Sequence, residues 1–165
     1  MKLKKTDGQT LALVLWLAIG AIAFAFLLPI ARSSGETMPL TAADITIVDG
    51  DTIKVAGHSY RLVGFDAPEI FSHAKCEAEV AKGLVTKGVL TDLVQTADRI
   101  ELIRKPCSCR PGTMEGEFKC NYGRYCATLL LDNEDIGPAL IHAGLAALYP
   151  YRWDAVPKKK DWCHD

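Results

Sequence analysis

The stretch ITIVDGDTIKVAGHSYRLVGFDAPE, residues 45–69, decides the fold of this 165-residue chain. Three runs rich in β-branched, aromatic and aliphatic residues are typical of β-strands, and they occupy 45–48, 52–55 and 60–65. Asp49-Gly50 separates the first two runs and favours a hairpin turn or a bulge. Pro68 ends the third run, because proline cannot donate to a strand ladder. The segment therefore predicts three short neighbouring strands.

The rest of the chain predicts two helices and two more strands. Residues 73–97 have helical spacing, since Ala81, Val85, Val89, Leu93 and Ala97 lie four apart on one predicted face. Strands are predicted at 99–103 and 124–131, a short helix at 136–148, and an irregular cysteine-rich insertion at 106–120. This order predicts an α+β, mainly β, fold: a five-stranded OB-type barrel with two packed helices.

The N-terminal stretch is strongly apolar. Residues 11–30 carry no charge, and a helix of this length spans about 30 Å, the hydrocarbon core of a bilayer. Three lysines precede it and favour a cytoplasmic N-terminus. We therefore expect a cytoplasmic segment at 1–10, a transmembrane signal-anchor at 11–30, a linker at 31–41 and a folded domain at 42–165. A cleaved signal peptide is the alternative.

Both alternatives place the domain outside the cytoplasm, as in a single-pass protein of a bacterial inner membrane with a periplasmic or extracellular domain. The six cysteines agree, because an even number in an exported domain indicates disulfides. The chain has a formal charge of −1, and without residues 1–30, which hold three lysines and one aspartate, the charge is −3. A nucleic-acid substrate would thus need local cations or a metal.

Carboxylates gather in the decisive stretch. Asp49 and Asp51 are two residues apart, so they share a face of an extended chain, and Asp66 ends the third run. Ligands that are all oxygen favour Ca²⁺ or Mg²⁺ over zinc. Ordinary turn chemistry explains one such aspartate, but three that converge indicate a metal site.

Several runs together resemble the staphylococcal-nuclease (thermonuclease) family. The resemblance covers about 42–148, and its motifs are Val48–Thr52, Arg61–Glu69, Tyr122–Arg124 and Gly144–Ala146. It implies an OB-type nuclease domain that cleaves the P–O5′ bond of DNA or RNA and leaves 3′-phosphate ends. A run such as Asp-Gly-Asp is common by itself, whereas all the runs in order form a specific signal.

The resemblance also implies roles for individual residues. One Ca²⁺ ion would be held by Asp51, Asp66 and the backbone carbonyl of Ala67, with Asp49 just outside direct contact. Glu69 would position or deprotonate the attacking water. Without the resemblance, a glutamate after a proline would usually be a surface residue, and a lone aspartate would usually be a turn residue.

Two arginines and a tyrosine complete the implied site. Arg61 and Arg124 would stabilise the negative charge that develops on phosphorus oxygens, since planar guanidinium groups match that geometry and stay charged. A lone arginine is otherwise explained by an ion pair or a capped turn. Tyr122 would contact a nucleotide phosphate.

The sequence departs from the family at several positions. Asn121 replaces a lysine, and Ala67 replaces a threonine. Tyr149 and Tyr151 lie one residue out of register with substrate-stacking tyrosines, so that role is not transferred. The family's long C-terminal helix is also missing here.

The shorter tail suggests a Cys76–Cys163 disulfide that joins the C-terminus to the start of the first helix. A zinc site formed by His73, Cys76, Cys163 and His164 is an alternative. Four cysteines stay unassigned, namely Cys107, Cys109, Cys120 and Cys126. A disulfide through Cys120 could close the insertion, while Cys126 could be a core residue. Alternatively, all four could form a zinc knuckle.

The sequence thus predicts a membrane-tethered, Ca²⁺-dependent nuclease that acts on DNA or RNA, and it implies no obligate protein partner. The first alternative is a catalytically silent OB-type module that binds nucleic acid. The second is an anchored cell-surface interaction protein with structural calcium. The presence of both arginines, the glutamate and the aspartates favours the enzyme. The choice between DNA and RNA, and the biological role, stay open.

Overall fold

The computed structural model describes residues 37–164 of the chain. The predicted cytoplasmic segment and signal-anchor, residues 1–30, lie outside the described residues. Within 37–164, no helix combines the length and the apolar character needed to cross a membrane.

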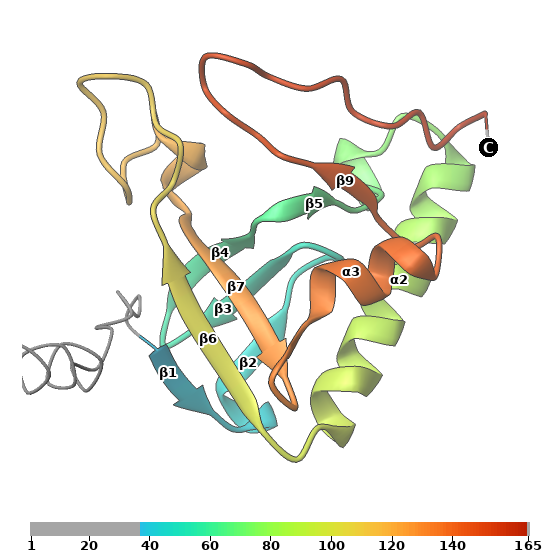
Figure 1. The fold of residues 1–165 in the computed structure, drawn as a ribbon. Helices are drawn as coiled ribbons and strands as arrows, with labels where there is room; N and C mark the ends of the chain where they lie inside the picture. Colours follow the sequence, from blue (N-terminus) through green and yellow to red (C-terminus); the bar gives the residue numbers. More distant parts are fainter. Residues whose placement is uncertain (1–36, 165) are drawn as a thin grey trace, which may run out of the picture. The chain divides into compact units, whose positions relative to one another are not determined.

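The fold is mixed α+β and consists mainly of strands, with a curled sheet that forms half a barrel (Figure 1). The main sheet has the strand order β1-β6-β7-β4-β3-β2, and β8 pairs with β7. All neighbours are antiparallel except β4 and β7, which are parallel. The bounds are β1 Thr37–Leu40, β2 Ile45–Ile47, β3 Thr52–Val55, β4 His58–Leu62, β6 Ile100–Lys105, β7 Tyr125–Leu131 and β8 Glu134–Asp135.

A second, two-stranded sheet lies beyond the end of β4. It pairs β5 (Gly64–Asp66) with β9 (Ala147–Tyr149) in antiparallel fashion. The predicted strand 60–65 is divided between β4 and β5. The division occurs where Gly64 has a φ of 97°, a left-handed conformation that favours glycine. This bend carries Phe65 and Asp66 out of the main sheet while Arg61 stays in it.

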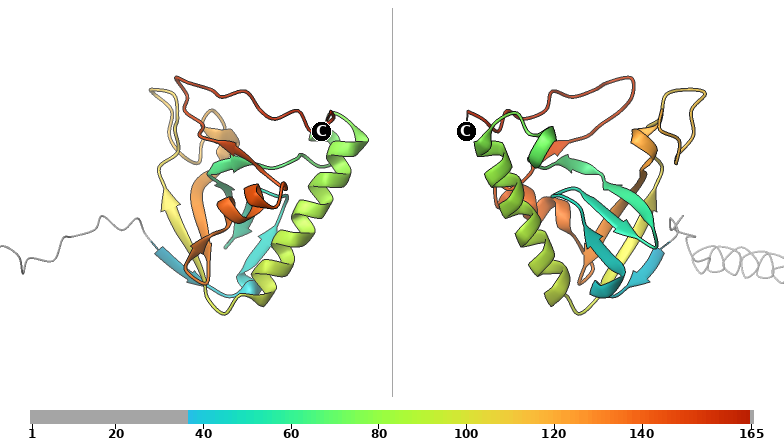
Figure 2. Two further views of the ribbon diagram at one scale, coloured as in Figure 1. Left: turned by 45° about the vertical axis from the view of Figure 1, so that its right-hand side comes forward. Right: turned by 180° about the vertical axis from the view of Figure 1, so that it is seen from behind.

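The α-helices of the described residues are α2 (Glu77–Thr96) and α3 (Ile136–His142). Figure 2 shows α2 extended along one side of the curled sheet, and α3 contacts β5 and β7. Short 3-10 turns are Ala42–Asp44, Phe71–His73 and Asn121–Gly123.

The buried face of α2 differs from the prediction. The sequence analysis chose Ala81, Val85, Val89, Leu93 and Ala97, but Val85 is 56% and Leu93 36% exposed. Residues four apart advance by more than one helical turn, so such a row winds slowly around the helix. The observed face steps by three and four: Glu79, Gly83, Thr86, Leu90 and Val94.

The core lies between the curled sheet and the two helices. Its fully buried side chains include Ile53, Leu62, Leu90, Leu102 and Leu129. Burial of such side chains is the main favourable contribution to folding, about 1.5–3 kcal/mol for each large aliphatic residue.

Residues 37–40, which the sequence analysis places in a linker, form β1 and pair with β6. Met38 and Leu40 pack against the core. Pro39 lies opposite Glu101 and is tolerated because β1 is an edge strand.

Candidate functional site

The turn between β2 and β3 approaches the rest of the protein closely at Gly50. A Cβ atom on this residue would lie 2.6 Å from the Ala67 Cβ and 2.7 Å from the Thr86 Cγ2. The turn is also held by the Asp51 backbone N–H, which donates to Asp49 Oδ1 at 3.1 Å. Only glycine allows this approach, which brings the turn to the residues that follow β5.

Arg61 joins two buried carboxylates at the centre of the site. Its guanidinium pairs through Nη1 with Asp51 and through Nη2 with Asp66 Oδ1 at 2.9 Å. The same Nη2 donates to the Phe65 carbonyl at 3.1 Å. Asp51 also accepts from the Ala67 N–H at 2.8 Å through Oδ2. Two predicted metal ligands therefore converge on one cation of the protein itself.

The charges of this group depend strongly on one another. Burial raises the pKa of Asp51 to about 7, and the neighbouring carboxylates of Asp49 and Asp66 act in the same direction, whereas Arg61 opposes the shift. Burial also acts against the charge of Arg61, but Asp51 and Asp66 outweigh it and raise its pKa. A cation in contact with these oxygens lowers the cost of keeping them ionised.

Arg124 directly precedes β7 and is hydrogen-bonded to Thr52, the first residue of β3. Its Nη1 donates to Thr52 Oγ1 at 3.2 Å. Asn121 fixes the other side of the guanidinium, since its carbonyl accepts from Nε at 3.2 Å and its Oδ1 from Nη2 at 3.1 Å. Burial and repulsion from Arg61 lower the pKa of Arg124, but guanidinium groups stay charged at neutral pH.

Glu69 follows the buried Pro68 and is fixed through its backbone. Its N–H donates to the buried carboxylate of Glu79 at 3.3 Å, and the other oxygen of Glu79 accepts from the Lys75 N–H at 2.8 Å. The Glu69 side chain is 33% exposed and pairs with Lys159 at 3.2 Å. It is thus held at its base and open to solvent at its carboxylate.

Tyr122 lies at the outer edge of the site and is 72% exposed. Its ring contacts Phe118 edge to face, with centroids 5.7 Å apart, and the Arg124 guanidinium carbon lies 5.7 Å from the ring centroid. It therefore presents an aromatic surface beside one of the predicted catalytic arginines.

A cavity of about 970 Å³ connects these groups. Six of the predicted site residues line it: Asp49, Arg61, Asp66, Glu69, Tyr122 and Arg124. Asp51 and Ala67 do not line the cavity, since they are only 4% and 3% exposed, but they are joined by the hydrogen bond from the Ala67 N–H to the Asp51 carboxylate. The structure therefore brings together every residue that the sequence analysis assigned to the site.

The residues fit a hard divalent cation in the chemistry of their donors. The carboxylates of Asp51 and Asp66 meet at Arg61, and burial disfavours the charge of Asp51 by raising its pKa. Calcium prefers such oxygen ligands. Within 37–164, no group of three or more His, Cys, Asp or Glu side chains has the arrangement of a metal site.

The predicted Cys76–Cys163 disulfide is present, with Cα atoms 6.0 Å apart. This pairing leaves no free thiols for the alternative zinc site with His73 and His164. His164 instead contacts Asp161, with 3.0 Å between its Nδ1 and the carboxylate.

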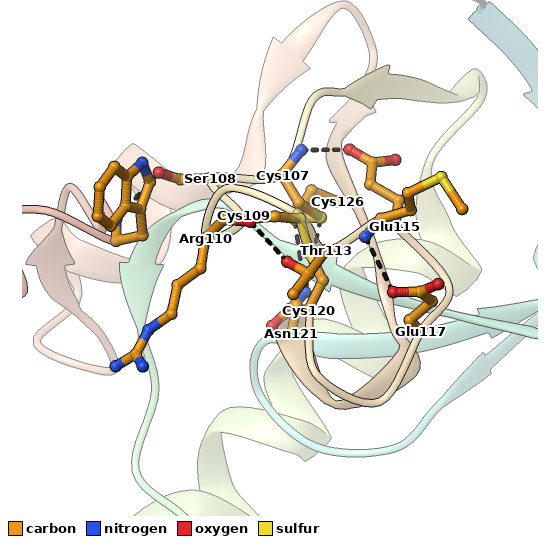
Figure 3. The surroundings of a disulfide bond; sticks show 12 residues. Cys107, Ser108, Cys109, Arg110, Thr113, Glu115, Glu117, Cys120, Asn121 and Cys126 are labelled. Carbon is orange, nitrogen blue, oxygen red and sulfur yellow. Dashed lines mark hydrogen bonds between the residues drawn. A yellow bond between two sulfur atoms is a disulfide. The ribbon is translucent and has the colours of Figure 1, made fainter.

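The four unassigned cysteines form two more disulfides, Cys107–Cys126 and Cys109–Cys120, each with Cα atoms 5.2 Å apart. Figure 3 shows that they lie close together: Cys107–Cys126 joins the insertion to β7, and Cys109–Cys120 closes the insertion on itself. Cys126 is thus a disulfide partner and not a free core residue.

The insertion forms one wall of the cavity through Ser108, Arg110, Phe118 and Lys119. In Figure 3, Arg110 points away from the side on which Glu115 and Glu117 lie. Because two disulfides close this insertion, its wall is held in place covalently.

Sequence reasoning missed Lys159 and Glu79. Burial acts against the charge of Lys159, but its hydrogen bonds and ion pairs with Asp66 and Glu69 outweigh burial and raise its pKa. One signal could have revealed Lys159: the predicted Cys76–Cys163 disulfide brings the tail to the loop after Glu69. Glu79 had no such signal, because a glutamate in the first turn of a helix is common.

Comparison with known proteins adds no assignment. No family model matches the chain, and no curated protein gives a significant match. The function proposed below therefore depends on the motifs and on the geometry of the described residues.

Proposed function

We propose that this chain is a metal-dependent nuclease with an OB-type barrel, similar to the staphylococcal-nuclease family, that hydrolyses phosphodiester bonds of DNA or RNA. The observation that carries the proposal is that Arg61 pairs with both Asp51 and Asp66, and that Arg61, Asp66, Glu69 and Arg124 line one cavity. Two guanidinium groups and a solvent-accessible carboxylate in one cavity are what in-line attack on a phosphodiester needs.

Asp51, Asp66 and the Ala67 carbonyl would hold the Ca²⁺ ion, and Asp49 would lie just outside direct contact. When bound, such an ion polarises a phosphoryl oxygen and lowers the pKa of an attacking water. The donor set favours this ion because all its members are oxygens.

Glu69 would accept a proton from the attacking water. Its backbone is fixed by Glu79, so its carboxylate can reach only a limited region of the cavity. General-base catalysis requires hydrogen-bond contact with the water, and it typically contributes about 10²–10⁴-fold in rate.

Arg61 and Arg124 would stabilise the charge on the reacting phosphoryl group. A guanidinium has five N–H donors, and the contacts of Arg61 with Asp51, Asp66 and the Phe65 carbonyl use three of them. The remaining donors can bind phosphate. Loss of one such donor typically costs about 3–4 kcal/mol of transition-state stabilisation.

Tyr122, exposed beside Arg124, would contact a nucleotide phosphate. The predicted signal-anchor would place the domain on the outer side of a bacterial inner membrane, and a cleaved signal would release it.

The test is hydrolysis of denatured DNA and of RNA by the purified full-length chain in detergent. We expect cleavage with Ca²⁺, no cleavage with EGTA, and 3′-phosphate products. Glu69→Gln and Arg124→Ala should each lower kcat by at least about 100-fold.

Glu77→Gln and Arg99→Ala are matched controls. Glu77 is exposed in the first turn of α2, and Arg99 is exposed and pairs with Glu101, away from the cavity. Both controls should keep full activity. Binding of nucleic acid without cleavage would favour the silent module, and neither binding nor cleavage would reject a nucleic-acid function.

A further inference from the structure

The tail between β9 and Cys163 crosses from the cysteine-rich insertion to the start of α2 (Figure 1). We call residues 150–162 the strap. Its first part contacts the insertion, where the Trp153 N–H donates to Ser108 Oγ at 3.0 Å. Its end is anchored by Trp162, which is only 3% exposed, and by the adjacent Cys76–Cys163 disulfide. The strap is thus held on both sides of the cavity.

Lys159 extends from the strap into the site. Its Nζ lies 2.9 Å from Asp66 Oδ1 and 3.2 Å from Glu69 Oε1. It lines the cavity together with Arg61 and Arg124. Its side chain is still 43% exposed, so a molecule in the cavity can reach it.

The ion pairs of Lys159 are not needed to hold the strap in place. Lys159 and Glu69 are both partly exposed, and such an ion pair contributes little to stability, typically about 0–1 kcal/mol, whereas the pair with Asp66 involves a buried carboxylate. The strap already has a buried tryptophan and a disulfide at its end. The consequence of this lysine is therefore electrostatic and local to the cavity.

The charges of the cavity explain what that consequence is. Three carboxylates (Asp49, Asp66 and Glu69) line the cavity, together with Arg61 and Arg124 and, on the wall formed by the insertion, Arg110 and Lys119. On their own side of the cavity, Asp66 and Glu69 repel a phosphodiester. An ammonium group between these two carboxylates reduces the repulsion, and it has three donors, of which the ion pairs use two.

We propose that Lys159 is a substrate-binding residue whose ammonium group binds a phosphate oxygen of the nucleic-acid strand, and that the Cys76–Cys163 disulfide holds it in the cavity. This inference rests on the proposed function.

The test measures binding of a fluorescein-labelled oligothymidylate to the full chain by anisotropy, in EGTA and over a range of salt concentrations. Lys159→Met keeps the aliphatic stem and removes the charge. Lys158→Met is the matched control, because Lys158 is exposed on the same strap and outside the cavity lining. Since Lys159 is partly exposed, its variant should fold normally.

We expect Lys159→Met to raise Kd about tenfold, the usual loss for a hydrogen bond to a charged group. The slope of log Kd against log salt should fall by about 0.7, the value for one phosphate contact on a single strand. Lys158→Met should change neither. Equal Kd values for the two variants, or a loss of kcat with unchanged Kd and salt slope, would overturn the inference and leave the nuclease proposal intact.

The disulfide is tested in the same assay with the paired variant Cys76→Ala/Cys163→Ala. We expect its Kd to match that of Lys159→Met, and addition of Lys159→Met to the pair should cause no further loss. A further tenfold loss would show that the disulfide does not position the lysine. If the wild-type chain neither binds the oligonucleotide nor cleaves it with Ca²⁺, the proposed function and this inference both fail.

Discussion

Replacement of Gly50 by alanine should damage both the fold and the site. The new Cβ would lie 2.6 Å from the Ala67 Cβ and 2.7 Å from the Thr86 Cγ2, whereas carbon atoms normally stay at least about 3.5 Å apart. Neither neighbour can move easily, because Ala67 has no side-chain rotamers and Thr86 is fully buried. The turn must therefore retreat by about 1 Å.

Two effects follow from this shift. Overpacking of a well-packed core costs about 1–3 kcal/mol, which lowers Tm by about 4–12 °C for a domain of this size. Because Asp51 follows Gly50 directly, the shift also moves Asp51 relative to Arg61. A displacement of about 1 Å can reduce activity about 100-fold.

Thermal unfolding followed by circular dichroism and single-strand cleavage assays measure the two effects. Gly88→Ala is the matched control, since a Cβ on Gly88 meets nothing within 4 Å. It should stabilise α2 by up to about 1 kcal/mol and leave activity unchanged. Ala67→Gly combined with Gly50→Ala should restore part of the lost stability. If Gly50→Ala behaves like Gly88→Ala, the close approach of the turn does not position the site.

Three further predictions concern the disulfide, the metal and Arg124. Loss of the Cys76–Cys163 bond, which spans 87 residues, should lower the free energy of unfolding by about 4.6 kcal/mol according to the chain-entropy relation. Urea titrations under non-reducing conditions measure this free energy, and a change below about 1 kcal/mol would contradict the prediction. Calcium at 100 times its Kd should stabilise the fold by about 2.7 kcal/mol, which thermal melts detect as a rise in Tm. If calcium raises the Tm of Asp51→Asn as much as that of the wild-type chain, Asp51 is not a ligand. Asn121→Ala removes the side-chain acceptor of Arg124 and should lower kcat about tenfold with little change in stability, measured by steady-state kinetics and thermal melts.

The sequence predicted most of the strands because their signals are local. Runs of β-branched residues and a tight Asp-Gly turn act between neighbours in the chain, and the structure places strands at 45–47 and 52–55 as expected. The division of the third strand at Gly64 and the pairing of β5 with β9 depend on contacts across more than 80 residues. Such long-range pairing leaves no periodic pattern in one sequence.

The same distinction applies to the site. Short motifs contained its acidic groups and arginines, so pattern reasoning could identify them. The burial of Glu79 depends on the path of α2, whose buried face was predicted partly wrongly, because a row of residues four apart is not parallel to the helix axis. Lys159 reaches the site only because the tail folds back, which local sequence does not show.

The strap and its disulfide also determine the product of proteolysis. Cleavage at an exposed bond between Trp153 and Lys159 would not release a fragment, because Cys163 stays bonded to Cys76. The nicked protein would run at full mass on a non-reducing gel and lose a short peptide only after reduction. Lys159 would thus stay beside the cavity through Cys163 in nicked molecules that look intact by size.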